Sequence, residues 1–311
     1  NQTDTIPPAL LDRMEAIRLS GYILEEKLEI ARKHLLPKQL KIHGLKKSQF
    51  SLPKVVLREI IDGYAREAGV RSLENNLKKL MRKSARKIVE KEVDLVKISK
   101  DDLPDLLGRK SFAEETRYKK PKIGVVTGLA YTSVGGATLF IEASRVDAKN
   151  PGFKQTGQLG DVMVESSEIA YTFIRSKGSR DEHIKKFFAE NFIHIHVPAG
   201  ATPKDGPSAG GAITVSLVSQ LTGIPIQQNV AMTGEIDLNG NITKIGGLIY
   251  KLQGAKRAGV TKVLIPKENK SDLDEIIEEN PGLIDDTFEV IPVEHVHQCE
   301  ILKYVNKNAQ S

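Results

Sequence analysis

Apolar residues recur every three or four positions through the first third of the chain, which is the spacing of amphipathic helices. The pattern predicts helices over residues 25–36, 52–67, 73–91 and 101–107. We expect Pro37 to end the first of these helices and Ser72 to cap the third. Alternating stretches are almost missing here, so this part of the chain is predicted to be a small helical bundle.

Beyond residue 122, short alternating stretches are interspersed with helical ones. Strands are predicted at residues 123–129, 138–143, 191–197, 230–238, 242–245, 262–265 and 287–291. Helices are predicted at residues 161–176, 208–221, 247–258 and 271–279, with a last one ending near 304. Asn239-Gly240, between two predicted strands, is typical of a hairpin turn. The expected fold class is therefore α+β, with a small all-helical unit followed by a unit built on a mixed α/β sheet.

The boundary between the two units is predicted from composition and charge. Residues 108–122 are charged and poor in apolar side chains, as linkers are, so we expect units at 1–115 and 116–311. Residues 1–122 carry a net charge of +10, and residues 123–311 a net charge of −4. A basic unit suits an acidic partner such as nucleic acid, or is a solvated, Lys-rich helical surface. No recognisable nucleic-acid motif is present, which favours the second interpretation.

Other signals limit the class of protein. The single cysteine, Cys299, excludes an internal disulfide and fits a reducing compartment. No signal peptide or long apolar run is recognisable. The chain begins at Asn1 in a stretch that resembles the middle of a domain, so we expect a piece of a longer protein. No phosphate-binding loop G-x-x-x-x-G-K-[ST] occurs, and we therefore expect no appreciable ATPase activity from this chain alone.

Ser208 lies where a glycine- and proline-rich loop, residues 203–211, enters an apolar segment. No charged residue occurs from Gly206 to Gly234, so the helix that follows Ser208 is predicted to be buried. Backbone N–H groups at its N-terminus suit an oxyanion. The simpler interpretation is a turn or helix cap. A third interpretation is the G-x-S-x-G nucleophile elbow, but that motif needs a strand running directly into the serine.

Lys251 is the candidate base for this serine. It lies in the apolar stripe formed by Leu248, Leu252, Ala255 and Ala258 of a predicted helix. Burial lowers the pKa of an amine, and a neutral lysine can deprotonate a serine hydroxyl. The alternative, left open by periodicity, is that its stem snorkels to water. Thr233 is a candidate to orient the amine. Asp205 is a helix cap, a charge partner or simply a turn residue.

Two further groups of residues suggest ligands. His194, His196, His295, His297 and Cys299 include ligand types that bind zinc, but the last three fall in a predicted helix, where alternation scatters side chains, so we expect no metal site. Arg13 and Arg71 lie near predicted helix starts, where an arginine can reach a phosphate. By spacing alone, surface ion pairs explain both arginines better than phosphate contacts do.

The motifs, taken together, resemble the Lon protease family. The resemblance rests on residues 203–210, Thr233-Gly234-Glu235, Gly246-Gly247-Leu248 with Lys251, residues 128–136 and 157–163, and the helical-unit stretches 5–34 and 67–74. It implies that residues 1–115 are the end of an AAA+ module with its helical subdomain and that residues 116–311 are the protease domain. Two positions depart from the usual family pattern: Tyr131 stands where tryptophan is usual, and Tyr250 where glutamate is usual. Residues 147–151 are also slightly extended.

The resemblance implies an ATP-dependent serine endopeptidase that hydrolyses unfolded or damaged proteins in protein quality control and the stress response. Ser208 is the expected nucleophile and Lys251 the general base. Arg13 falls on the arginine-finger position, Arg71 on the sensor-2 position, and Asn1 on the sensor-1 position. ATP with Mg²⁺ is the expected cofactor of the full-length protein, with none needed for peptide hydrolysis by this chain.

The expected partners are protein substrates and further copies of the chain in a homohexamer, with DNA as another partner and no membrane. The expected location is the bacterial cytoplasm, or the mitochondrial matrix if the source is eukaryotic. The alternative function is a basic DNA-binding or adaptor module fused to a non-catalytic α+β domain.

Overall fold

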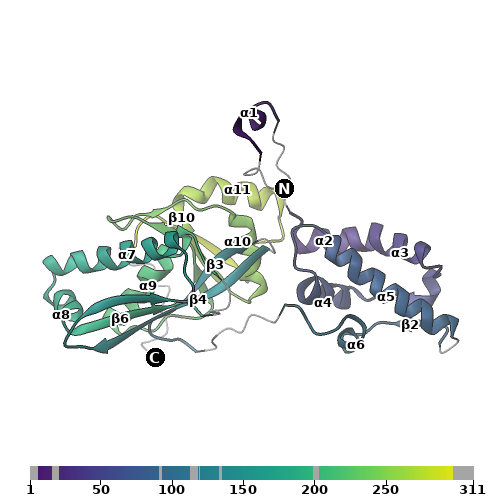
Figure 1. Ribbon diagram of the computed structural model, residues 1–311, viewed down its shortest axis with the longest axis horizontal. Coiled ribbons are helices and arrows are strands. Elements are labelled where there is room, and N and C mark those ends of the chain that lie inside the picture. Colours follow the sequence, from purple (N-terminus) through teal and green to yellow (C-terminus); the bar gives the residue numbers. More distant parts are fainter. Residues whose placement is uncertain are drawn as a thin grey trace. The chain divides into compact units, whose positions relative to one another are not determined.

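The computed structural model describes residues 6–15, 21–90, 93–112, 118, 120–132, 135–198 and 203–296. The chain forms two compact units, Asn1–Ala113 and Glu114–Ser311 (Figure 1). Of the expected helix that ends near residue 304, the part beyond residue 296 lies outside the described residues, as do Asn1, His297 and Cys299. The prediction that His295 is helical is wrong, because His295 forms an antiparallel bridge with Asn241.

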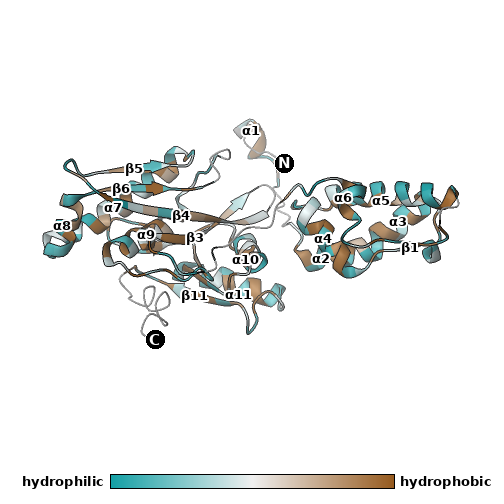
Figure 2. Cartoon of the chain, turned by 90° about the horizontal axis from the view of Figure 1, so that it is seen from below, coloured by the Kyte–Doolittle hydropathy of each residue, from teal (hydrophilic) through white to brown (hydrophobic). Residues whose placement is uncertain are grey.

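The first unit is a helical bundle, as the apolar spacing predicts. Its helices are α1 (Pro8–Leu11), α2 (Leu24–Ile30), a π-helical segment (Ala31–Leu35), α3 (Leu36–Ile42), a 3₁₀ turn (Lys47–Gln49), α4 (Lys54–Tyr64), α5 (Arg71–Val89) and α6 (Leu103–Leu107). Two short strands, β1 (Phe50–Ser51) and β2 (Val96–Lys97), pair in parallel. The core is formed by apolar stripes such as Leu73, Leu77 and Leu80 of α5, all fully buried. Figure 2 shows the visible side of α5 as largely hydrophilic, in keeping with its exposed Lys and Arg residues.

Two predicted helix ends in this unit are wrong. Pro37 does not stop the first helix: α2, the π-helical segment and α3 follow one another without a break, and Pro37 lies in the first turn of α3. The π-helical segment before it absorbs the change in hydrogen bonding, and the Leu36 N–H bonds the Ala31 carbonyl. Ser72 is not a cap: α5 already begins at Arg71, after Val70.

The second unit is built on a mixed sheet, so the α+β class predicted from the sequence is confirmed. Within the described residues the sheet has seven strands in the order β11-β10-β7-β3-β4-β6-β5. They are β3 (Val125–Thr132), β4 (Gly135–Asp147), β5 (Gly152–Thr156), β6 (Asn191–His196), β7 (Val230–Met232), β10 (Lys262–Pro266) and β11 (Glu289–Val293). The β3–β4 and β4–β6 pairs are antiparallel, and the others are parallel.

Helices cover both faces of this sheet. They are α7 (Asp161–Ser176), a 3₁₀ turn (Lys177–Ser179), α8 (Glu182–Glu190), α9 (Gly210–Thr222) after a 3₁₀ turn (Pro207–Ala209), α10 (Leu248–Arg257), and α11 (Lys270–Glu279) after a 3₁₀ turn (Lys267–Asn269). Alternate residues of a strand face opposite sides. Met232 of β7 packs with α7 and α9 in one core, whereas Ala231 packs with α10 and α11 in another. The sheet therefore separates α7–α9 from α10 and α11.

Three features of this unit differ from the sequence-based expectation. Neither β5 nor α8 was predicted. The predicted strand over 230–238 is split, because β7 ends at Met232 and the chain then leaves the large sheet. The next residues form a separate antiparallel hairpin from β8 (Glu235–Ile236) and β9 (Ile242–Thr243). The hairpin at Asn239-Gly240 is therefore confirmed, but it belongs to this smaller sheet.

Helix α10 lies unusually close to strand β4, because glycines face each other at the contact. A Cβ on Gly136 would lie 1.7 Å from the Tyr250 carbonyl oxygen, and one on Gly254 would lie 2.6 Å from the Gly136 carbonyl carbon. No other residue fits at these distances. The two glycines therefore set how far α10 stands from the sheet, and α10 is the helix that carries Lys251.

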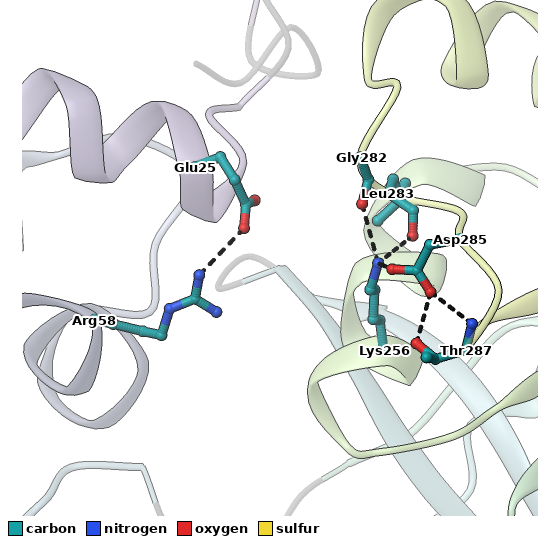
Figure 3. A network of polar contacts seen from close by, with 7 residues as sticks. All are labelled: Glu25, Arg58, Lys256, Gly282, Leu283, Asp285 and Thr287. Atoms are coloured by element: carbon teal, nitrogen blue, oxygen red, sulfur yellow. Dashed lines mark hydrogen bonds and ion pairs between the residues drawn. The ribbon is translucent and has the colours of Figure 1, made fainter. Parts of the chain in front are cut away.

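At its C-terminal end, α10 is anchored by a polar network (Figure 3). Lys256 Nζ donates to the Gly282 and Leu283 carbonyl oxygens at 3.0 and 2.7 Å and pairs with Asp285 Oδ2 at 2.6 Å. The other Asp285 oxygen accepts hydrogen bonds from the Thr287 N–H and hydroxyl. In the first unit, Glu25 and Arg58, also drawn there, form an exposed ion pair between α2 and α4.

Candidate active site

Ser208 lies in the 3₁₀ turn that leads into α9, and its side chain is half-buried. Gly206 before it has φ of 115°, a left-handed conformation that favours glycine. Helix α9 is buried along most of its length, as the uncharged run from Gly206 predicts. The serine is thus presented at the N-terminal end of a buried helix.

The Ser208 backbone is held by the residues that follow β7. Its carbonyl oxygen accepts a hydrogen bond from the Gly234 N–H at 2.9 Å and from the Thr233 hydroxyl at 3.3 Å. Thr233 is fully buried, and its own N–H bonds the Leu264 carbonyl of β10 at 3.0 Å. Strand β7 ends at Met232, and Thr233 keeps this one bond to β10 while its hydroxyl and the Gly234 N–H bond the serine.

Lys251 is buried in α10, with 3% of its surface exposed, so it does not snorkel to water. Its Nζ donates to Thr233 Oγ1 at 3.2 Å, inside the protein. Loss of hydration lowers the pKa of Lys251 from 10.5 to about 8. A substantial neutral fraction of this amine is therefore present at ordinary pH. Thr233 links it to Ser208, because the threonine hydroxyl accepts from the amine and donates to the serine carbonyl.

Ser208 and Lys251 line the same groove, which has a volume of about 740 Å³. In the part of the chain that the structure describes, their reactive atoms make no direct hydrogen bond with each other. Apolar residues that include Leu139, Phe140 and Met163 line much of the groove. Tyr131 is at its rim, 53% exposed, and stacks on Tyr250 with ring centroids 4.8 Å apart. The two positions that depart from the family pattern therefore contact each other.

Asp205 caps a helix, but not the one that follows Ser208. Its Oδ1 accepts hydrogen bonds from the Met163 N–H in the first turn of α7 at 3.0 Å and from the Gly206 N–H at 2.9 Å. A carboxylate at a helix N-terminus also interacts favourably with the helix dipole. Asp205 therefore ties the serine loop to α7.

Lys204, which the sequence analysis did not single out, makes a second tie in the same loop. Its Nζ donates to the Gly157 carbonyl at 2.8 Å, and burial lowers its pKa. Its backbone carbonyl also accepts from the Gly160 N–H at 2.7 Å. The sequence signal that could have identified Lys204 is its position beside Asp205 in the same loop motif.

The nucleophile-elbow interpretation is wrong, because β6 ends at His196 and no strand runs directly into Ser208. On β6, the ring nitrogens His194 Nε2 and His196 Nδ1 each lie 2.8 Å from the Thr156 hydroxyl. Among the residues described, no group of three or more His, Cys, Asp or Glu side chains is arranged to hold a metal ion.

The candidate nucleotide-sensing residues lie in the helical unit, apart from the groove residues in sequence. Arg13 is exposed in the turn after α1, and Arg71 is exposed as the first residue of α5. The loop before Arg71 is held in place, since Glu67 Oε1 accepts the Leu73 N–H at 2.9 Å. Asn1 lies outside the described residues.

A half-buried serine at the start of a buried helix, with a buried amine joined to its backbone through a threonine, is an arrangement suited to the chemistry of serine peptidases that use a lysine base. Comparison with known proteins agrees. Residues 97–306 match the model of the Lon protease (S16) C-terminal proteolytic domain, and residues 41–96 match that of the Lon protease AAA+ ATPase lid domain. The chain belongs to the Lon protease family.

Curated relatives support this assignment over most of the chain. Lon protease 1 of Syntrophotalea carbinolica is 54% identical over 276 residues, which are 89% of this chain and 34% of the relative. Lon protease of Trichlorobacter lovleyi is 46% identical over 303 residues, 97% of this chain and 36% of the relative. Lon protease of Clostridioides difficile is 47% identical over 299 residues, 96% and 37% of the two chains. The chain thus spans about a third of the length of the curated relatives it matches.

These comparisons lend no support to the alternative of a DNA-binding or adaptor module. None of the helices within the described ranges is both long and apolar enough to cross a membrane.

Proposed function

We propose that this chain hydrolyses peptide bonds with Ser208 as the nucleophile and Lys251 as the general base. The observation that carries the proposal is the buried Lys251 amine, joined through Thr233 to the Ser208 backbone at the edge of one groove. The proposal includes the division near residue 115 into an AAA+ helical subdomain and a protease domain.

Each of these residues has a separate role in the proposed reaction. The neutral Lys251 amine takes the proton from Ser208 Oγ as that oxygen attacks the substrate carbonyl carbon. The positive end of the α9 dipole, at the helix N-terminus beside Ser208, stabilises the resulting oxyanion. The protonated amine then gives its proton to the leaving nitrogen as the C–N bond breaks. A water molecule, deprotonated by the same amine, releases the acyl group and regenerates Ser208.

Two supporting roles follow. Thr233 uses its hydroxyl to fix the orientation of the amine, since it accepts from Nζ while it donates to the Ser208 carbonyl. Asp205 holds the serine loop against α7. Neither residue needs to change its protonation state during the reaction.

The proposed substrates are unfolded or damaged proteins. A groove of about 740 Å³ accommodates an extended peptide segment and not a folded domain. Its apolar lining suits side chains that are exposed when a protein unfolds. For the longer protein we propose a homohexamer in the bacterial cytoplasm, on the basis of the bacterial Lon proteases to which the chain is similar.

For the longer protein we also propose that ATP with Mg²⁺ drives substrate delivery, because residues 41–96 match an AAA+ ATPase lid. Arg13 and Arg71, exposed cations in the helical unit, fit a polyphosphate, and Asn1 is assigned a role beside them from the family pattern. This sequence has no phosphate-binding loop, so these residues would complete a site and not form one.

The test compares cleavage of an unfolded, fluorescently labelled protein by the wild type, Ser208→Ala and Lys251→Ala. Exposed Ser179→Ala and Lys186→Ala are matched controls on the same unit. Both site variants should lose activity, and both controls should keep it. Labelling by a fluorophosphonate, located by mass spectrometry, reports the nucleophile even where ring assembly limits turnover. Full activity in both site variants would refute the dyad.

A further inference from the structure

Residues 244–247 form one wall of the groove, although they belong to no helix or strand. They connect the β8–β9 hairpin to α10. Gly247 is left-handed, with φ of 66°, and precedes the first residue of α10. Its carbonyl oxygen accepts the Lys251 N–H at 3.2 Å. The position of this connecting segment therefore determines where α10 begins and where Lys251 lies.

The side chain of Asn269 hydrogen-bonds the backbone of this connecting segment. It is fully buried, at the end of the 3₁₀ turn before α11. Its Oδ1 accepts the Ile245 N–H at 3.0 Å, and its Nδ2 donates to the Ile245 carbonyl at 2.9 Å. The second Nδ2 hydrogen goes to Asp272 Oδ2 at 2.6 Å. The Asn269 amide thus hydrogen-bonds both the N–H and the carbonyl of Ile245, as a neighbouring strand would. Its three hydrogen bonds also determine which side of the amide is oxygen and which is nitrogen.

Two carboxylates reinforce the same contact. Glu268 Oε2 accepts the Lys244 N–H at 2.7 Å, and Asp272 Oδ1 pairs with Lys244 Nζ at 2.9 Å. We call Asn269, Glu268 and Asp272 the α11 clamp. The clamp follows β10 directly, and β10 also bonds the Thr233 N–H through the Leu264 carbonyl. Both the threonine and the segment that leads to Lys251 are therefore fixed to the same strand.

We propose that Asn269 is a positioning residue that sets the Lys251 amine against Thr233 and Ser208. The inference rests on the peptidase function proposed above. Without the amide, the Ile245 N–H and carbonyl would be buried without partners, which a segment avoids by moving. Such a movement displaces the start of α10 and admits water beside the amine.

The test measures hydrolysis of a fluorogenic peptide across pH by the full chain and its variants. Asn269→Ala should lower kcat by between about 10- and 100-fold, the range expected for a misplaced catalytic group. It should lower kcat by a larger factor than it raises KM. The acid limb of the pH–rate profile should move to higher pH, because a hydrated lysine is a stronger base.

A pair of charge variants keeps the test decisive if Asn269→Ala does not fold. Asn269→Asp loses the donor to Ile245 and places a second carboxylate against Asp272. Adding Asp272→Asn restores a donor between the two side chains, so the double variant should recover several-fold of the lost kcat. Asn191→Ala is the matched control. It also removes a buried amide, one that bonds the Phe187 carbonyl at 2.7 Å and does not line the groove.

The control should lose thermal stability without a change in kcat or in the pH–rate profile. The proposal is overturned if folded Asn269 variants keep the wild-type kcat and profile, or if the double variant is no more active than Asn269→Asp. It is also overturned if Asn191→Ala loses as much kcat at an equal loss of stability. A failure of the peptidase function itself is distinguishable, because the wild type would then show no activity that depends on Ser208.

Discussion

Peptide hydrolysis by this chain should depend on pH through one buried amine. Only neutral Lys251 can take the proton from Ser208, and burial lowers its pKa to about 8 from the usual 10.5. The rate should therefore rise through about pH 8 and level off above about pH 9. Below about pH 7 it should fall tenfold for each unit of pH.

The size of the effect follows from the two pKa values. At pH 7 an amine with a pKa of about 8 is neutral in roughly one molecule in eleven, whereas one with a pKa of 10.5 is neutral in roughly one in three thousand. Burial of Lys251 therefore raises the fraction of competent molecules at neutral pH by roughly 300-fold. That gain is as large as general base catalysis commonly contributes.

The assay is cleavage of a fluorogenic peptide between pH 5.5 and 9.5 at constant ionic strength, with circular dichroism at each pH to verify folding. Lys186→Ala, an exposed lysine on α8, should leave the profile unchanged. A rate that is flat over this range would refute the assignment of Lys251 as the base. So would a midpoint near 6.5, which would indicate a histidine.

Three further predictions concern stability and packing. Lys251→Met should be inactive yet more stable to urea at pH 7, by up to about 3 kcal/mol. Because burial lowers the pKa of this lysine, the advantage should be full below pH 8 and should vanish by about pH 10.5. Gly136→Ala should abolish peptide hydrolysis in folded protein, since its Cβ would meet the Tyr250 carbonyl oxygen; unchanged activity would contradict the close contact of α10 with β4. The pKa of Asp285 is lowered to about 2, chiefly by its hydrogen bond with Lys256. Its stabilising effect is present above about pH 4 and lost as pH falls toward 2, so Asp285→Asn should flatten the fall of Tm over that interval.

Hydrophobic periodicity predicts those helices and strands whose apolar pattern is contained within their own residues. Helix α7 has the predicted bounds, because its buried residues recur every three or four positions from Met163 through Ala170 to Ile174. The sequence before α8 also contains a helix signal, because aspartate is a common N-cap residue, but the prediction did not use it. Asp181 precedes α8 and accepts hydrogen bonds from the His183 and Ile184 N–H groups. Strand β5 had no such signal, since Gly152–Thr156 has neither an alternating nor an apolar pattern and is a strand only because it pairs with β6.

The sequence predicted those parts of the candidate site that depend on residue type and on the pattern of nearby residues. The uncharged run predicts burial of α9, whereas the apolar stripe around Lys251 left open whether its amine is buried or reaches water. What the sequence could not indicate is the set of partners across the fold. The bond from Asp205 to α7 and the bond from Asn269 to Ile245 join segments whose proximity depends on strand order. A predicted strand over 230–238 likewise conceals that Thr233 and Gly234 bond Ser208 beyond the end of β7.

The place of β7 between β3 and β10 has a consequence for how the site is first made. Thr127 of β3 pairs with Ala231 of β7, and β7 pairs in turn with β10 through Ala231 and Val263. Parallel pairings between segments so distant in sequence form slowly, because a long loop must close before any contact forms. Thr233 and Lys251 come together only once these pairings exist. Under the mechanism proposed above, Ser208 therefore gains its base only when this sheet has formed, and the proposed peptidase activity should appear together with the complete fold and not before it.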